Sequence, residues 1–253
     1  MKRTLTTLFL LASVFCAPAD CPDNPCSHHI TAIGDCPDEG CRQKPFDPDH
    51  PNDAELNKVK NIRPDAPAAV GPATLRSIRW IKGLEDPKNL VECGSRAELQ
   101  QLGEGEKITV VAWALTARKG SEEKCNCDLG TKDDADNHIV LVDPAVKNPT
   151  LAKHECSSVT AEFTPRVRKE HPKFTQRDLN LKIDPNWKSK QSNANGKLLV
   201  RVTGLLMFDS GHFFRDPLPR DTNWEVHPVL KVEYCPKDKE CRADSDDNWA
   251  NLE

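Results

Sequence analysis

The sequence predicts a mainly β protein: a five-stranded Greek-key barrel with one helix between strands 3 and 4, preceded by an irregular, cysteine-rich extension. Three observations support this prediction. Segments in which apolar and polar residues alternate with a period of two follow one another after residue 105. Ten of the 20 prolines lie in the first third of the chain, where continuous apolar segments are missing. Gly204 lies inside the longest alternating segment, where a glycine indicates the bulge or coil that closes a small barrel.

The first 19 residues are predicted to be a secretory signal peptide. Lys2 and Arg3 precede an apolar run from Leu5 to Val14, and small residues follow up to Ala19, near the expected cleavage site. No later run reaches the ~20 apolar residues that a membrane span requires. The mature chain is therefore expected to be a secreted or periplasmic bacterial protein.

A lipid anchor at Cys16 is not expected. The bulky Phe15 stands where lipoprotein processing requires a small side chain. Removal of the signal peptide also removes Lys2 and Arg3, which changes the formal net charge from −4 to −6. An acidic chain of this kind does not favour general binding of polyanions.

Four segments follow from this pattern: the signal peptide at 1–19, the extension at 20–104, the barrel domain at 105–236 and a C-terminal tail at 237–253. Two short helices are expected in the extension. Asp53 is the expected N-cap of a helix over residues 54–59. Residues 95–102 resemble a second helix, which begins at Ser95 and has Glu98 in the position that completes a capping box.

Five strands are expected in the barrel domain, at 108–117, 138–142, 158–164, 197–209 and 224–234. Between the third and fourth strands a helix is expected over 175–183, with Thr175 as its cap and Asp178 completing the box. This order resembles that of the oligonucleotide/oligosaccharide-binding barrel, the OB-fold, over about residues 105–236. The run Val-Arg-Val-Thr-Gly at 200–204 looks like the fourth strand of many such proteins.

Three short motifs are similar to those of a group of uncharacterised bacterial secreted proteins with OB-fold-like domains. They are Asn137-His138-Ile139, Glu162-Phe163-Thr164-Pro165-Arg166 and the Thr-Asn-Trp-Glu-Val-His-Pro run at 222–228. That resemblance implies a fold and an exported location. It offers no activity to carry over, so the function must be argued from the residues.

Ten cysteines remain when Cys16 is set aside, an even number that suits disulfides in an oxidising compartment. The predicted disulfide cysteines are Cys21, Cys26, Cys36, Cys41, Cys93, Cys125, Cys127, Cys156, Cys235 and Cys241. The first four form the repeat C-P-D-x-x-C, which is expected to contain two disulfides. The alternative for this repeat is a zinc site completed by His28 or His29, although zinc ligands more commonly come in tighter C-x2-C pairs.

The pair Cys125 and Cys127 is too close in sequence to form a comfortable bond between its own members. Cys156 and Cys93 are the candidate partners of the two, and Cys235 is expected to bond Cys241. A metal site built from Cys125 and Cys127 with His138 and either Cys156 or His154 is the alternative, which an oxidising compartment disfavours.

The candidate binding residues come from the two loops that flank the ligand-binding face of an OB-like barrel, and from the adjoining strands. His138 follows the first loop, His212 lies in the second, and Glu225 and His227 share one face of the last strand because they are two residues apart. The predicted common polar surface at the rim comprises His138, Glu162, Arg166, His212, Glu225 and His227. The alternative is that these side chains only hydrogen-bond one another to satisfy buried groups.

The function predicted from these residues is an exported binding protein that holds a ligand or partner on the barrel rim. Glycan, small molecule, nucleic acid and protein ligands remain open; nucleic acid is weakly supported, because a basic run at 166–190 is accompanied by only 6% aromatic residues. No metal or cofactor is assigned. One alternative is a metal-dependent hydrolase or nuclease that uses His138, Glu162, Arg166, Glu225 and His227, with Asp136 as a further carboxylate. Another is a structural envelope protein without a ligand.

Overall fold

A computed structural model describes residues 21, 23–131, 133–215 and 219–252 of the 253-residue chain. The predicted signal peptide at 1–19 and Cys16 lie outside the described residues. No helix among the described residues is long and apolar enough to cross a membrane.

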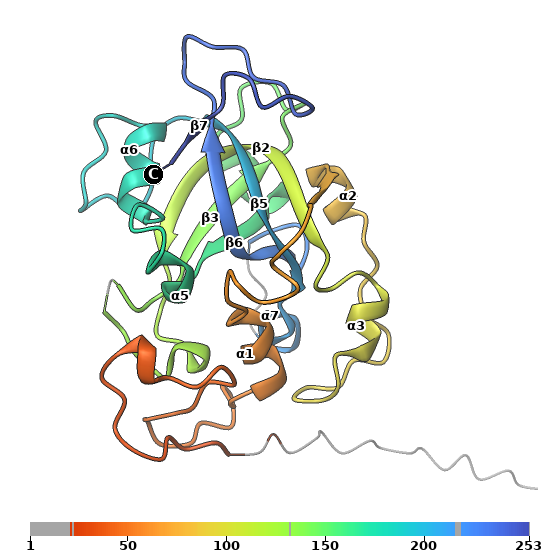
Figure 1. Cartoon of the computed structure of the whole chain (residues 1–253), viewed down its shortest axis with the longest axis vertical. Coiled ribbons are helices and arrows are strands. Elements are labelled where there is room, and N and C mark those ends of the chain that lie inside the picture. The colour runs from red at the N-terminus through yellow and green to blue at the C-terminus, as the bar shows by residue number, and fades with distance from the viewer. Residues whose placement is uncertain (1–20, 22, 132, 216–218, 253) are drawn as a thin grey trace, which may run out of the picture.

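The core of the molecule is a closed five-stranded barrel, as predicted (Figure 1). Its strands are β2 (Lys107–Lys119), β3 (Asn137–Val142), β4 (Val159–Phe163), β5 (Leu198–Phe208) and β6 (Trp224–Tyr234). They pair in the order β2–β3–β4–β6–β5, and β5 pairs back with β2; all of these pairs are antiparallel except β4–β6. Two short strands add to it: β1 (Thr74–Arg76) pairs with β2, and β7 (Ala250–Asn251) pairs with β6.

The predicted helix between the third and fourth barrel strands is α6 (Gln176–Ile183). The hydroxyl of Thr175 accepts the backbone N–H of Asp178 at 3.1 Å, and Leu179 and Ile183 are buried in the core. Asn180 on the same helix is fully buried, and its side-chain amide bonds both the N–H and the C=O of Ala117 at 2.8 and 2.9 Å. The helix therefore closes the barrel beside the bulge of β2 between Ala114 and Thr116.

Gly204 lies at a bulge, because the register of β5 against β6 shifts on both sides of it. A Cβ atom at this position would lie 2.5 Å from the carbonyl oxygen of Pro228 and 2.6 Å from Cγ1 of Val226. The glycine is thus required by the close approach of β6 and not by an unusual backbone conformation.

Replacement of Gly204 by valine is expected to lower the free energy of unfolding by about 1 to 3 kcal/mol, because the added side chain overpacks the β5–β6 contact. Thermal melts of both proteins test this. A matched control is Gly83→Ala, at an exposed glycine with an ordinary helical backbone, where an added Cβ would meet its nearest neighbour at 3.4 Å. A melting temperature for Gly204→Val within a degree of wild type would show that β6 can move away from β5.

The remaining helices are short. The α-helices are α1 (Ala54–Lys60), α2 (Ile78–Lys82), α3 (Ala97–Gln101), α4 (Leu151–His154), α5 (Pro165–Arg168) and α7 (Ser210–Phe214), and the 3-10 helices are η1 (Ile33–Asp35), η2 (Lys124–Asn126) and η3 (Glu155–Ser157). Asp53 caps α1 as predicted. The predicted capping box of α3 is wrong: the Glu98 carboxylate instead accepts the backbone N–H groups of Lys88 and Asn89. It therefore holds the preceding loop and not the start of its own helix.

Four disulfides join the described cysteines: Cys21–Cys93, Cys26–Cys41, Cys36–Cys127 and Cys235–Cys241. The last is the predicted pair. The prediction of two disulfides within the C-P-D-x-x-C repeat is wrong, because only Cys26–Cys41 lies inside it. Cys125 and Cys156 are free thiols, which corrects the prediction that they are bonded. The other two cysteines of the repeat, Cys21 and Cys36, instead bond partners 72 and 91 residues away.

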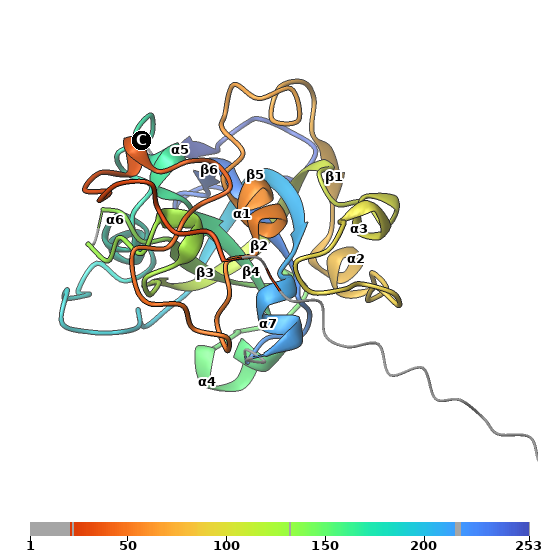
Figure 2. The ribbon, with the colours of Figure 1, turned by 90° about the horizontal axis from the view of Figure 1, so that it is seen from below.

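Residues 23–60 of the N-terminal extension lie across one end of the barrel, α2 and α3 lie along its side, and the segment between β6 and β7 lies at the other end (Figures 1 and 2). Arg166 of α5 helps to fix the extension in this place, since its guanidinium donates to the carbonyl oxygens of Cys36 and Pro37 at 3.0 Å. The Cys36–Cys127 disulfide joins the extension to the loop between β2 and β3. The barrel end that carries the predicted site residues is therefore partly covered.

Candidate functional site

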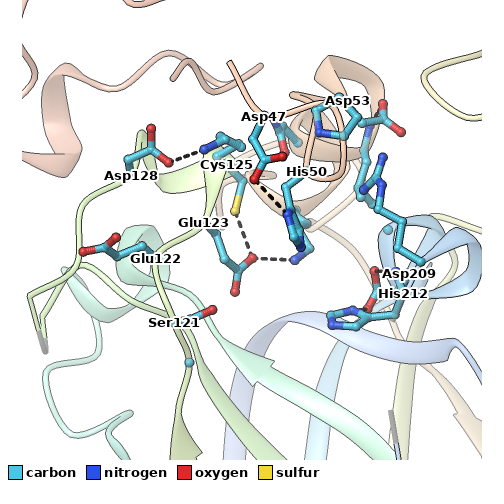
Figure 3. Close-up of a pocket in the computed structure, with 18 of the residues that line it drawn as sticks. Asp47, His50, Asp53, Ser121, Glu122, Glu123, Cys125, Asp128, Asp209 and His212 are labelled. Carbon is cyan, nitrogen blue, oxygen red and sulfur yellow. Dashed lines mark hydrogen bonds and ion pairs between the residues drawn. The ribbon is translucent and has the colours of Figure 1, made fainter. Parts of the chain in front are cut away.

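A cleft of about 560 Å³ opens between the extension and the barrel. Residues 44–60 of the extension form one wall, the β2–β3 loop at 118–128 forms another, and Asp209, Gly211 and His212 form a third. Both loops that the sequence predicted to flank the site thus meet here. Figure 3 shows His50, Glu123 and His212, one side chain from each wall, facing the same space.

Several ionisable side chains meet at the base of this cleft. We refer to Glu123, Asp136, His138, Glu162, Glu225 and His227 as the buried cluster. His138 on β3 lies directly opposite Glu162 on β4. The parallel pairing of β4 with β6, at Ala161 and Val226, brings the side chains of Glu225 and His227 next to Glu162. The cluster therefore follows from the strand order of the barrel.

Glu162 is the centre of the cluster, because its two carboxylate oxygens face different imidazoles. Oε1 lies 3.3 Å from Nε2 of His138, and Oε2 lies 3.0 Å from Nδ1 of His227. Nδ1 of His227 also lies 3.3 Å from Glu225, while Nε2 of the same ring lies 3.7 Å from Oδ2 of Asp136. Glu123 extends the cluster to the cleft, with its Oε1 3.8 Å from His138.

Two buried basic residues flank the cluster. Lys60 of α1 donates to Oε2 of Glu123 at 2.6 Å. Arg220 donates at 2.7 Å both to Glu225 and to Asp209, and Asp209 in turn hydrogen-bonds Nδ1 of His212. A continuous chain of charged contacts therefore runs from His212, at the cleft, to His227, in the interior.

The electrostatics of the cluster are set by burial and by the close opposite charges. Burial disfavours both imidazolium ions, yet the Glu162 carboxylate outweighs it and raises the pKa of His138 to about 9 and that of His227 to about 10. Burial raises the pKa of Glu123, but Lys60 outweighs it and lowers that pKa to about 2. Burial and the neighbouring Glu123 raise the pKa of Asp136 to about 7. Without another cation, the histidines thus act as the counter-ions of the carboxylates.

Three overlapping groups of side chains in this region have ligand atoms within 4.8 Å of one another and could hold a metal ion. They are Asp136, Glu162 and His227; Glu123, His138 and Glu162; and Glu123, Cys125 and Asp136. Burial raises the pKa of the Cys125 thiol well above its ordinary value, so the Cys125 side chain is a neutral thiol at neutral pH. The two groups that share Glu162 therefore offer the stronger ligand sets.

Several polar atoms of the cluster are buried without a hydrogen-bond partner: Nε2 of His138, Nε2 of His227 and Oε2 of Glu162. Most buried polar atoms in proteins are hydrogen-bonded. The contacts of these three atoms are close ion-pair distances without hydrogen-bond geometry. Imidazole nitrogens and carboxylate oxygens in this arrangement are suitable ligands for a cation.

Of the six predicted binding residues, the structure brings His138, Glu162, Glu225 and His227 together, and His212 lies beyond them through Asp209 and Arg220. Arg166 does not join the cluster, because its guanidinium bonds the extension. Arg166 and Arg168 are both buried, whereas Arg177, the third arginine of the basic run, is exposed.

Sequence reasoning missed Lys60 and Glu123. Lys60 lies four residues after Leu56, on the buried face of α1, and this spacing was the available signal. Glu123 is one acid among several in a polar loop, and nothing in its neighbourhood distinguishes it. Its role depends on a contact with Lys60, which is 63 residues away along the chain.

The pair of His212 and Asp209 predicts a pH-dependent stability. Burial lowers the pKa of His212, but the hydrogen bond to Asp209 outweighs it, so that this pKa is raised even though Arg220 and Lys60 oppose the shift. Because the folded pKa is raised, the stabilisation is fully present below about pH 6.5 and is lost as the pH rises through the folded value. His212→Gln is therefore expected to lower stability by about 0.5 to 1 kcal/mol near pH 5.5 and by less above pH 8. Urea denaturation of both proteins at the two pH values measures the difference, and an effect that grows with pH would contradict it.

Comparison with known protein families, with curated proteins and with solved structures found no match to this chain.

Proposed function

We propose that this is an exported binding protein whose ligand is a divalent metal cation, held at the base of the cleft by Asp136, Glu162 and His227. One observation carries the proposal. These three residues place ligand atoms within 4.8 Å of one another, and two of the atoms in the group, Nε2 of His227 and Oε2 of Glu162, are buried without a hydrogen-bond partner. A cation between Nε2 of His227 and Oδ2 of Asp136, which lie 3.7 Å apart, would satisfy that nitrogen, and the Glu162 carboxylate would complete the ligand set.

The surroundings of these ligands support the proposal. Histidines that bind metals usually direct their other ring nitrogen to a carboxylate or carbonyl, which fixes the ring. Nδ1 of His227 lies 3.0 Å from Glu162 and 3.3 Å from Glu225, and Arg220 holds the Glu225 carboxylate from the other side. Asn126 donates to Oδ1 of Asp136 at 3.0 Å, which leaves Oδ2 turned toward His227. The ring of His227 and the carboxylate of Asp136 are thus each held in place by neighbouring side chains.

The ligand types indicate the class of cation. Imidazole combined with carboxylates suits Zn²⁺, Mn²⁺ or Fe²⁺, whereas Ca²⁺ and Mg²⁺ prefer ligand sets made only of oxygen. Metal binding requires neutral histidine, so the affinity is expected to rise with pH as the imidazoles lose their protons. We therefore regard a transition-metal cation as the ligand.

The test is the thermal shift produced by Zn²⁺ or Mn²⁺ after the purified protein is stripped with a chelator. At a free concentration 100 times the dissociation constant, the cation is expected to stabilise the fold by about 2.7 kcal/mol. That corresponds to a rise in melting temperature of about 5 to 10 °C for a chain of this size. Glu162→Gln, which keeps the shape of the side chain but removes its charge, is expected to abolish the shift.

Glu104→Gln is the matched control. Glu104 is a buried glutamate that pairs with Arg96 outside the cluster, with Nε to Oε2 at 2.8 Å. This variant is expected to start from a lower melting temperature and to retain the full metal-dependent rise. A wild-type protein that gains no stability from either cation, and that carries none when purified, would show that the cluster is an ion-pair network with a structural role only.

Metal-assisted hydrolysis is the second candidate function. It is favoured by the position of His138, which belongs to the cluster and also lines the cleft together with Lys60 and His212. A cation there could activate water, and the imidazole of His212 could transfer protons. The hydrolysis of bis(p-nitrophenyl) phosphate by metal-loaded protein, and its loss in Glu162→Gln but not in Glu104→Gln, tests this candidate.

A further inference from the structure

The two carboxylate oxygens of Glu162 serve two different ligand groups. Its Oε2 belongs to the interior group with His227 and Asp136, whereas its Oε1 lies 3.3 Å from Nε2 of His138, in the group completed by Glu123. A single carboxylate shared in this way is the geometry of a bridge between two cations, which in two-metal sites lie about 3.5 to 4 Å apart.

The two groups differ in their access to solvent. Asp136 and His227 of the interior group have side chains that are 1% and 0% exposed, and neither lines the cleft. Glu123 and His138 of the outer group are half-buried, with exposed fractions of 18% and 29%, and both line the cleft. Any cation held by the outer group therefore has one side open to a ligand in the cleft.

An unsatisfied atom points to the outer position independently of the carboxylates. Nε2 of His138 is buried and has no hydrogen-bond partner, although it lies near both Glu162 and Glu123. Lys60 occupies Oε2 of Glu123 at 2.6 Å, and Oε1 of the same carboxylate is left on the side of His138. The outer group thus offers one nitrogen and two oxygens that protein donors do not occupy with hydrogen-bond geometry.

The charge of the cleft indicates which ligand would complete such a cation. Apart from histidines, six basic and six acidic side chains line the cleft, so its fixed charge is balanced. With the buried Asp136, Glu162 and Glu225 and with Arg220 included, the fixed charge is −2, so two divalent cations would make it +2 and the cleft would attract anions. Oxyanions of the phosphate type are the anions that two-metal sites hold between their cations.

We infer that a second divalent cation binds Glu123, His138 and Oε1 of Glu162, that Glu162 bridges it to the interior cation, and that its open side binds a phosphate-type oxyanion in the cleft. This inference rests on the proposed function, since the interior cation is one of the two. It adds to that proposal a second cation, a carboxylate ligand shared by the two cations, and the class of anion that binds in the cleft.

Manganese loading tests the inference in the full mature chain. Metal analysis of Mn²⁺-loaded protein is expected to give two ions per chain, and its electron paramagnetic resonance spectrum is expected to be that of a spin-coupled pair. His138→Gln is expected to retain one ion, with the spectrum of an isolated ion. His50→Gln is the matched control, a histidine of the same cleft outside both ligand groups, and it is expected to retain two coupled ions.

The anion is tested with phenylphosphonate by isothermal titration calorimetry. Binding is expected to the two-ion wild-type protein, and a loss of at least tenfold in affinity is expected both for His138→Gln and for metal-free protein. One ion in the wild type, two ions without spin coupling, two ions in His138→Gln, or phosphonate binding that does not depend on metal would each overturn the inference. A wild type that binds no ion at all would instead refute the proposed function, so the two failures are distinct.

Discussion

Replacement of Arg220 by methionine is expected to lower the free energy of unfolding of the metal-free protein by about 3 to 5 kcal/mol. The guanidinium is 4% exposed and bonds two buried carboxylates, Asp209 and Glu225, at 2.7 Å each. Burial alone would lower its pKa, but these two carboxylates raise it, so the arginine remains charged. Methionine fills the space but leaves both carboxylates without this cation. Urea denaturation at neutral pH measures the loss.

The same change is expected to weaken the binding of the proposed interior cation by about 10- to 100-fold, because Arg220 orients Glu225 and Glu225 orients His227. Arg220→Lys is the control, since it keeps a positive charge but loses the fork that bonds two carboxylates at once. It is expected to lie between the wild type and Arg220→Met. A loss of stability below about 1 kcal/mol for Arg220→Met would mean that water replaces the guanidinium.

Removal of the Cys36–Cys127 disulfide is expected to have the second large effect. The bond joins residues 91 apart and holds the extension against the loop that carries Glu123. The double variant Cys36→Ser/Cys127→Ser is expected to lose about 2 to 5 kcal/mol of stability. It is also expected to expose residues 42–60 to limited proteolysis, because this part of the extension is then held against the barrel domain by hydrogen bonds such as those of Arg166 and Lys60.

Cys235→Ser/Cys241→Ser provides the comparison, since this disulfide joins two cysteines only six residues apart, after the last barrel strand. It is expected to cost less, because a short loop restricts the unfolded chain less, and to leave the extension protected. If both double variants showed the same proteolytic pattern as wild type, the disulfide would not be what holds the extension over the cleft.

The sequence was sufficient for the features that depend on local pattern. The period of two located all five barrel strands, and Thr175 and Asp53 marked two helix starts, because an N-cap is a contact between neighbours in the chain. Gly204 indicated the bulge for a related reason, since only glycine tolerates the approach of Pro228. Once the strand order was given, the meeting of His138 with Glu162 followed from register.

Features set by contacts distant in sequence could not be predicted. The bonding of Cys36 to Cys127, and the free state of Cys125, depend on how the extension folds over the barrel, and cysteine spacing does not encode that. The same holds for the site. Glu123 joins the cluster from the β2–β3 loop and is held there by Lys60 of α1, and this contact follows from the packing of the extension on the barrel.

The pairing of β3, β4 and β6 makes the buried cluster rigid. His138, Glu162 and His227 stand on three strands joined by backbone hydrogen bonds, so they cannot separate without breaking the barrel wall. The geometry is thus fixed before any ligand arrives, and little conformational entropy is lost on binding. A rigid frame of this kind also discriminates between ions by radius, because it cannot widen or contract to suit a poorly fitting one.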